Sequence, residues 1–410
     1  MNNRILDYNQ VLQKLRKLER NSDVIKSAEH LGRTTLNLPI LHYTVGSGKN
    51  HIVLSASQHG CEIITTDFLL ALMDKISSKD KRFEFLNNGH YTLHFLPMLN
   101  PEGYIISTSA VRTVIKRNTS DFEAQSLYHE YLEAYRRDDL DCKLKLNTKE
   151  KYHQKFFGHI DPYLLMQNNF KKAHKIIAKI YDNKELSRGT LAVWHSNANG
   201  VDLNQNMPYN YKIQAIQEGK KLYSLFRYDN IETTRPGPIG CPMRVKEFQY
   251  EPENVALLNF LYDLKYNKNI ELCAFMNYHS TGGLVYYRPY NNLQEVHPNH
   301  VLKNMDIEEV YNKKIAEIYS KNTDYRLMEG ESGFNCFNDL LRLHIPGNIL
   351  IELSKFTGNP IGPYVRENYK KVIEDNINAT AITLEKIPEL NRIKKEFIKS
   401  KEKKREVLER

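Results

Sequence analysis

Short apolar runs alternate with amphipathic segments along this chain, which predicts an α/β protein: a single domain with a mixed, largely parallel central sheet flanked by helices on both faces. Two further observations support one large domain. The chain has 410 residues, of which 41% are hydrophobic, and no internal repeat or low-complexity linker divides it. A sizeable buried core is therefore expected, and disorder is excluded as the overall state.

The predicted elements follow one another as helix, strand, helix and strand. Residues 1–30 are expected to be helical, with leucines at helical spacing. The apolar run 51–57 has the length of a buried strand, and residues 62–77 repeat their apolar side chains every three or four positions, which is typical of a helix face. Further strands are expected at 91–99, 191–195, 271–279 and 348–354, and further helices at 252–266 and 364–386.

Residues 118–188 fit this alternation badly. They are rich in Tyr, Lys, Asp, Glu and Asn and contain helical stretches such as FEAQSLYHEYLEAYRR. We therefore predict a domain over residues 1–390 that carries an inserted helical cap at 118–188, followed by a basic tail, helical or disordered, at 391–410.

The net charge of +9 is concentrated near the end of the chain. Residues 392–410 contain nine Lys or Arg and four Glu, so more than half of the excess lies there. The rest of the chain has no zinc-finger or RNP signature, and no nucleic acid is expected as a partner. A mixed-charge segment of this kind is typical of a solvated helix, with salt-sensitive attachment to an acidic partner as the alternative.

Cysteine usage and hydropathy bear on the compartment. The five cysteines include no CxxC pair, which argues against a disulfide framework. The first residues, MNNRILDYNQ, lack the apolar region of a signal peptide, and no apolar run approaches the length of a membrane span. These features predict a cytoplasmic protein.

The stretch SASQHGCEII at residues 55–64 raises the first question about chemistry. It places His59 and Glu62 where a predicted strand turns into a predicted helix, the position at which α/β proteins bind ligands. An imidazole and a carboxylate at one turn suit zinc, although an isolated HxxE pair is more often a surface pair. The candidate third ligand is His279, which ends the strand at 271–279; its alternative is a satisfied core histidine.

Glu352 occupies a similar position inside the apolar segment NILIELS. Burying a carboxylate is costly unless something pairs with it. Beside a zinc-bound water, Glu352 would serve as general base and then as general acid. The alternative is a Glu on an edge strand that points at water.

Five stretches in this order resemble the zinc carboxypeptidase (M14-type) metallopeptidase family: QHGCE, LPMLNPEGY, NGVDLNQNMP, NYHSTGG and IPGNILIELSKFTGNPIGPY. The likeness extends over residues 30–385 and is interrupted at 118–188. The resemblance implies the fold predicted above and a peptide substrate. It also implies that His59, Glu62 and His279 bind a single Zn²⁺ and that Glu352 is the catalytic acid/base.

The resemblance implies further roles. Asp202 matches the residue that orients the first zinc histidine, and Asn204 and Gln205 match an Asn-Arg pair that binds the substrate's C-terminal carboxylate. Gln205 departs from that pattern, because a Gln brings neither the charge nor the bidentate fork of an Arg. Whether the enzyme acts as an exopeptidase or an endopeptidase therefore stays open.

A second departure concerns the Arg that polarises the scissile carbonyl in the family. The matching position, counted from Asn100, is Ile115. We take Arg117 as the first candidate for this role and Arg112 as the second. Cations from the insertion, Arg136 or Arg137, are alternatives.

The segments WHSNANGVDLNQNMP and YEPENVALLNF are most similar to the bacterial branch that cleaves γ-D-glutamyl–diamino acid bonds in peptidoglycan peptides. This likeness implies a zinc metallopeptidase that acts on a cell-wall peptide such as a muropeptide. Two alternatives remain: a deacylase-type zinc amidohydrolase of N-acyl amino acids, and a catalytically reduced peptide-binding protein. Gln205 and Ile115 favour the latter. Cys61, between two predicted ligands, is expected to be a small buried filler.

Overall fold

The structure is a computed structural model that describes residues 5–34, 37–114, 194, 197, 202–204, 206, 231–234, 243–245, 250–288, 302–329, 336–355 and 369–408. The predicted insertion at 118–188 lies outside the described residues. So does the predicted strand at 191–195, apart from Trp194.

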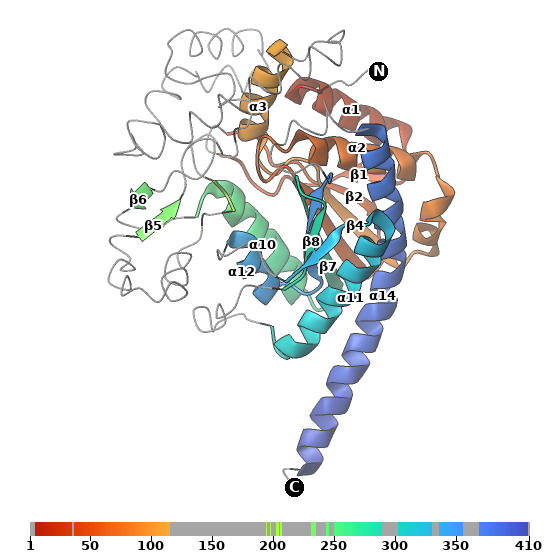
Figure 1. Cartoon of the computed structure of the whole chain (residues 1–410). Helices are drawn as coiled ribbons and strands as arrows, with labels where there is room; N and C mark the ends of the chain where they lie inside the picture. The colour runs from red at the N-terminus through yellow and green to blue at the C-terminus, as the bar shows by residue number, and fades with distance from the viewer. Residues whose placement is uncertain are drawn as a thin grey trace.

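An eight-stranded mixed sheet forms the centre of the molecule, in the order β1-β2-β4-β3-β7-β10-β8-β9 (Figure 1). The pairs β4–β3, β3–β7, β7–β10 and β8–β9 are parallel, and the other three are antiparallel. The predicted mixed, largely parallel sheet is thus confirmed. Its strands are β1 (Ile25–Ser27), β2 (Tyr43–Gly46), β3 (Asn50–Ala56), β4 (Tyr91–Leu96), β7 (Glu271–Ser280), β8 (Leu284–Tyr286), β9 (Arg326–Met328) and β10 (Asn348–Leu353). A separate pair is formed by β5 (Ile231–Thr234) and β6 (Met243–Val245).

Helices cover both faces of the sheet (Figure 1). One face carries α1 (Tyr8–Asn21), α2 (Ile63–Ser77), α11 (Met305–Thr323) and α14 (Tyr369–Leu408), and the other carries α10 (Pro252–Tyr266) and α12 (Phe337–His344). The 3₁₀ helix η1 (Lys81–Asn88) precedes β4, and α3 (Pro101–Val114) follows it. None of the described helices is long and apolar enough to cross a membrane.

Each face of the sheet has its own hydrophobic cluster, because successive side chains of a strand point to opposite faces. In β3, Ile52 and Leu54 belong to the cluster under α1, α2 and α14, whereas Val53 belongs to the cluster under α10 and α12. The second face also carries polar residues. His51 and Ser55 lie two positions before and after Val53 in β3, so they share its face. This polar content proves important for the functional site.

The terminal helices differ in extent from the prediction. α1 begins at Tyr8 because the Asp7 side chain accepts a hydrogen bond from the Gln10 backbone, and the Gln10 side chain accepts one from the Asp7 backbone. It ends at Asn21, shortly before β1. α14 begins at Tyr369 and continues to residue 408, so the described residues of the predicted basic tail form the end of this helix.

The sequence patterns missed the four outer strands β1, β2, β8 and β9. Each is only three or four residues long, which is too short to show a strand period.

Candidate metal centre

The ends of two neighbouring strands, β3 and β7, bring the predicted ligands together. His59 and Glu62 lie in the turn between β3 and α2, and His279 lies near the end of β7, which pairs in parallel with β3. One ligand atom from each residue lies within 4.8 Å of the other two, and all three residues are buried. The carboxyl ends of parallel strands thus form the site, as expected for an α/β sheet.

Local packing fixes the turn that carries His59. Ser57 follows β3 with a positive φ of 48°, and its backbone N–H donates to the Thr65 hydroxyl at 2.9 Å. Gly60 lies so close to Gly103 that a Cβ at residue 60 would come within 2.1 Å of the Gly103 backbone. Only glycine fits there, which explains the Gly in QHGCE and ties this turn to the NPEGY segment.

The NPEGY segment is the start of α3. The Asn100 side chain accepts a hydrogen bond from the Gly103 N–H at 2.9 Å, as an N-cap residue does, and Pro101 takes the first helical position. The Asn100 amide also donates to the Gln58 backbone carbonyl at 3.1 Å. One asparagine therefore both begins the helix and holds the turn beside His59.

The two histidines turn the same nitrogen toward Glu62. His59 Nδ1 lies 2.9 Å from Glu62 Oε1, and His279 Nδ1 lies 3.2 Å from Glu62 Oε2. Their outer Nε2 atoms have other partners: Asp202 Oδ1 at 3.1 Å for His59, and Gln58 Oε1 at 3.0 Å for His279. Two oriented imidazoles and one carboxylate form a donor set that suits zinc.

The charges in this cluster favour ionised groups despite burial. Burial by itself lowers the pKa of His59, but the carboxylates of Glu62 and Asp202 outweigh it and raise that pKa well above its ordinary value. Burial likewise raises the pKa of Glu62, yet the two histidines hold that pKa below its usual range. The carboxylate is therefore ionised and available as a ligand at neutral pH.

Glu352 lies beside His279 in the sheet. The two residues are paired in the parallel register of β10 and β7, so their side chains emerge on the same face. β10 lies between β7 and β8, so it is not an edge strand and that alternative is wrong. Glu352 is half-buried at this position.

The described residues of NGVDLNQNMP pack against the beginning of α10. The Asn206 side chain accepts hydrogen bonds from the Glu251 backbone at 2.8 Å and from the Asn254 amide at 3.1 Å. Asn254 also donates to the Leu203 carbonyl at 2.9 Å. The helix start thereby holds the loop that presents Asp202 to His59.

Trp194 and the EPEN segment belong to the same unit. The buried Trp194 indole donates to the Asn197 carbonyl at 3.2 Å, and the Asn197 amide donates to Glu251 at 2.9 Å and Glu253 at 3.2 Å. The segment that contains Trp194 and Asn197 thus contacts the EPEN segment, which also holds the Asp202 loop.

Other predicted residues are only partly described. Arg112 lies in α3 but its side chain is beyond the described part, and Arg117, Gln205 and Ile115 lie outside it altogether. Asn204 is buried, and its backbone N–H donates to Asp202 Oδ1 at 2.9 Å. Cys61 is buried as expected, and burial followed by the Glu62 charge raises the pKa of its thiol well above the ordinary value.

The sequence reasoning missed three amide side chains around His279: Gln58, Asn277 and Asn338. Two of them had a local signal. Gln58 precedes the first ligand directly, and Asn277 lies two positions before His279, on the same face of β7. Asn338, in α12, had none.

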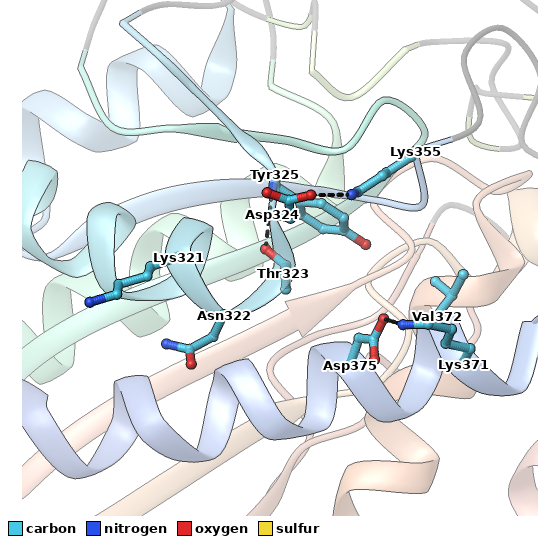
Figure 2. Close-up of a pocket in the computed structure, with 9 residues that line it drawn as sticks. All are labelled: Lys321, Asn322, Thr323, Asp324, Tyr325, Lys355, Lys371, Val372 and Asp375. Atoms are coloured by element: carbon cyan, nitrogen blue, oxygen red, sulfur yellow. Dashed lines mark hydrogen bonds and ion pairs between the residues drawn. The ribbon is translucent and has the colours of Figure 1, made fainter.

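A cavity of about 450 Å³ lies elsewhere, between the end of α11 and the beginning of α14 (Figure 2). Two of its lysines are paired with aspartates: Lys355 with Asp324 at 2.9 Å, and Lys371 with Asp375 at 2.5 Å. None of the predicted site residues that the structure describes lines this cavity. We therefore assign it no part in the metal centre.

Comparisons with known proteins agree with this fold. The family model for zinc carboxypeptidases matches residues 11–340, a range that ends before Glu352. No curated protein matches the chain.

Two solved structures are similar. Thrombin activatable fibrinolysis inhibitor is 13% identical, with a TM-score of 0.52, and the match covers 93% of this chain and 74% of that one. Bovine thrombin-activatable fibrinolysis inhibitor, in complex with tick carboxypeptidase inhibitor, is also 13% identical, with a TM-score of 0.50 and coverage of 95% and 98%. At such identities the likeness shows the fold alone. The family match spans most of the sequence, and the chain therefore belongs to the zinc carboxypeptidase family and is a metallopeptidase-type hydrolase.

Proposed function

We propose that His59, Glu62 and His279 bind one Zn²⁺ and that Glu352 moves the proton during hydrolysis of a peptide bond. The convergence of the first three residues, buried and within 4.8 Å of one another, is the observation that carries the proposal. The register that places Glu352 beside His279 adds the fourth group.

When bound, the zinc ion would supply a water of lowered pKa and would polarise the scissile carbonyl. The chain's own contribution is proton transfer and orientation. A carboxylate oxygen of Glu352 takes a proton from the attacking water and delivers it to the amide nitrogen as the C–N bond breaks. Asp202 holds the His59 ring through its outer nitrogen, which keeps Nδ1 directed at the site.

Further roles extend this proposal. Arg117, or failing that Arg112, would stabilise the negative charge that develops on the carbonyl oxygen; loss of such a donor typically lowers the rate by about 10²–10³. Asn204 and Gln205 would contact the end of the substrate. Without the Arg that the family has at position 205, recognition of a free carboxylate needs another cation.

The substrate that we propose is a bacterial cell-wall peptide with a γ-D-glutamyl–diamino acid linkage. The support is the likeness of two segments to that branch of the family, together with the contacts between them. Trp194, Asn197, Glu251 and Glu253 form one hydrogen-bonded chain beside the Asp202 loop, so the residues behind the likeness lie near the site.

Replacement of the proposed proton carrier tests the mechanism. E352Q should bind zinc as the wild type does, because Glu352 is no ligand, yet its kcat should fall by about 10²–10⁴. Zinc content measured by atomic absorption and peptide hydrolysis measured on the same preparation give both results. Unchanged turnover in E352Q would show that another group carries the proton.

A substrate panel tests the specificity. We expect hydrolysis of γ-D-glutamyl-diaminopimelate peptides, abolished by a chelator and restored by Zn²⁺. N-acyl amino acids test the deacylase alternative, and cleavage of these alone would contradict the proposed substrate. Stoichiometric zinc without hydrolysis of any peptide would favour the peptide-binding alternative.

A further inference from the structure

The two histidines of the metal centre are supported in chemically different ways. The outer nitrogen of His59 faces the carboxylate of Asp202. The outer nitrogen of His279 faces a group of neutral amides: Gln58 Oε1 at 3.0 Å, Asn277 Nδ2 at 3.1 Å and Asn338 Nδ2 at 3.3 Å. All three amide residues are at most 1% exposed, so water does not compete for these contacts.

The two asparagine nitrogens that face His279 also face amide oxygens. Asn277 Nδ2 donates to Gln58 Oε1 at 3.0 Å and to Asn338 Oδ1 at 2.8 Å. Asn338 Nδ2 donates to Gln58 Oε1 at 3.1 Å and to Asn204 Oδ1 at 2.9 Å. An amide nitrogen is a donor only, so neither asparagine nitrogen can accept a hydrogen from His279 Nε2.

The position of the His279 proton in a metal-bound site follows from these partners. A metal ligand needs Nδ1 unprotonated, so Nε2 then carries the hydrogen, and Gln58 Oε1 is the only acceptor among the three amide atoms that face it. Nδ1 is directed toward Glu62, the other proposed ligand. Turning the Gln58 amide over would instead direct its N–H₂ group at two other N–H₂ groups.

Gln58 is held in this orientation at a cost. Its Nε2 atom is buried and has no hydrogen-bond partner among the residues that the structure describes. A buried donor without a partner destabilises a protein by about 1–3 kcal/mol. An apolar side chain of similar size would avoid that penalty, so the gain from Gln58 has to come from its oxygen.

We propose that Gln58 is a positioning residue for the metal centre: its side-chain oxygen fixes the proton and the ring orientation of His279, and Asn277 and Asn338 fix that oxygen. This inference rests on the proposed zinc site. Neutral amides would thus orient His279, whereas the carboxylate of Asp202 orients His59.

The amides also connect the two sides. Asn338 donates to Asn204 through both its backbone N–H, at 3.2 Å, and its side chain, and the Asn204 backbone donates to Asp202. A continuous path of hydrogen bonds therefore runs from His279 through Gln58, Asn338 and Asn204 to the carboxylate that holds His59.

The test is the zinc affinity of three variants, measured by competition with a chelator. Q58M removes the acceptor at nearly constant volume and should bind zinc about 10–100-fold more weakly, the usual effect of losing a residue that orients a ligand. Q58E keeps an acceptor oxygen and should bind at least as tightly as the wild type. N348L is the matched control: Asn348 is a buried amide with an unpartnered Nδ2 among the described residues, at the opposite end of β10.

Thermal unfolding of the zinc-free proteins separates positioning from stability. Q58M and N348L should both unfold at a temperature different from that of the wild type, but only Q58M should lose zinc affinity. Equal zinc affinity in Q58M and the wild type would overturn the inference while leaving the metal centre intact. If Q58M does not fold, Q58E decides, because a loss of tenfold or more with a carboxylate at this position would also overturn it. A wild-type protein that binds no zinc would overturn the proposed metal centre, and this inference with it.

Discussion

Glu62 is the carboxylate that contacts both histidines of the metal centre. Its two oxygens face the Nδ1 atoms of His59 and His279, while Asp202 approaches His59 from the other side. Removing one histidine leaves a buried carboxylate short of a partner as well as a metal site short of a donor. The three residues therefore act as one unit.

Substitution of the first ligand should abolish metal binding. H59A leaves two of the three protein ligands. Zinc affinity should therefore fall further than the about 10–100-fold that is lost when a residue supporting a ligand is removed. Zinc content after dialysis measures this, and far-ultraviolet circular dichroism checks that the fold is kept. The control is H90A, at an exposed histidine. If H59A retains stoichiometric zinc, the ligand assignment is wrong.

The alternation of side chains along neighbouring strands decides which face of the sheet does chemistry. Ser55 on β3 is in register with Asn277 on β7, and His279 is in register with Glu352 on β10. All four lie on the face that α10 and α12 cover, while the opposite face packs against α1, α2 and α14 with apolar residues. The same strands thus contribute apolar side chains to the core on one face and polar side chains to the site on the other.

Three histidines at the other end of this face form a hydrogen-bonded chain. His42 Nε2 lies 2.9 Å from His94 Nδ1, and His51 Nδ1 lies 2.8 Å from His94 Nε2. Burial lowers the pKa of His42 to about 4, and burial together with the two neighbouring rings lowers the pKa of His94 to about 2. The folded protein therefore keeps these rings neutral where an unfolded chain would protonate them.

Stability should accordingly fall with acidity. Unfolded histidines titrate near pH 6.5, so the contribution of these rings is complete above that pH and is lost as the pH falls from 6.5 toward 4. We expect these rings to lower the free energy of unfolding in urea by about 2–4 kcal/mol between pH 7.5 and pH 5. H94N should flatten this dependence, and an identical slope in H94N and the wild type would argue against the histidine chain as its source.

The C-terminal helix joins distant parts of the whole molecule. α14 packs along α11, and its last turns extend beyond it (Figure 1). Lys394 contacts both oxygens of Glu308, at 3.0 and 3.1 Å, and Lys401 lies 2.8 Å from Asp306. Part of the positive charge near the end of the chain is therefore paired with carboxylates at the beginning of α11.

The buried Lys394–Glu308 pair provides a test of this connection. Burial raises the pKa of Glu308, and Lys394 partly reverses the shift. K394M leaves that carboxylate buried without its cation and should lower the free energy of unfolding by about 3–5 kcal/mol. The double variant K394M/E308L should recover most of the loss, and K399M, at an exposed lysine, should change little. Urea unfolding of the four proteins measures these differences; a K394M variant as stable as the wild type would contradict the proposed connection.

The inner strands β3, β4, β7 and β10, the helices α2 and α10, and the three candidate ligands could be predicted from the sequence. Strand β3, helix α2 and strand β7 are long enough for their apolar period to be visible, and the motifs around His59 and His279 end those strands. Such patterns are local, because each depends on a few consecutive residues. The short outer strands carried too few residues for a period to emerge.

Only the tertiary structure decided how His279 is supported and where Glu352 lies. Gln58 meets Asn277 across 219 positions and Asn338 across 280, and no local pattern encodes such a meeting. The interior position of β10 likewise depends on strand order, which removed the edge-strand alternative for Glu352. Side-chain hydrogen bonds form only when the pairing register of several strands is fixed at once, and that register is a property of the folded chain as a whole.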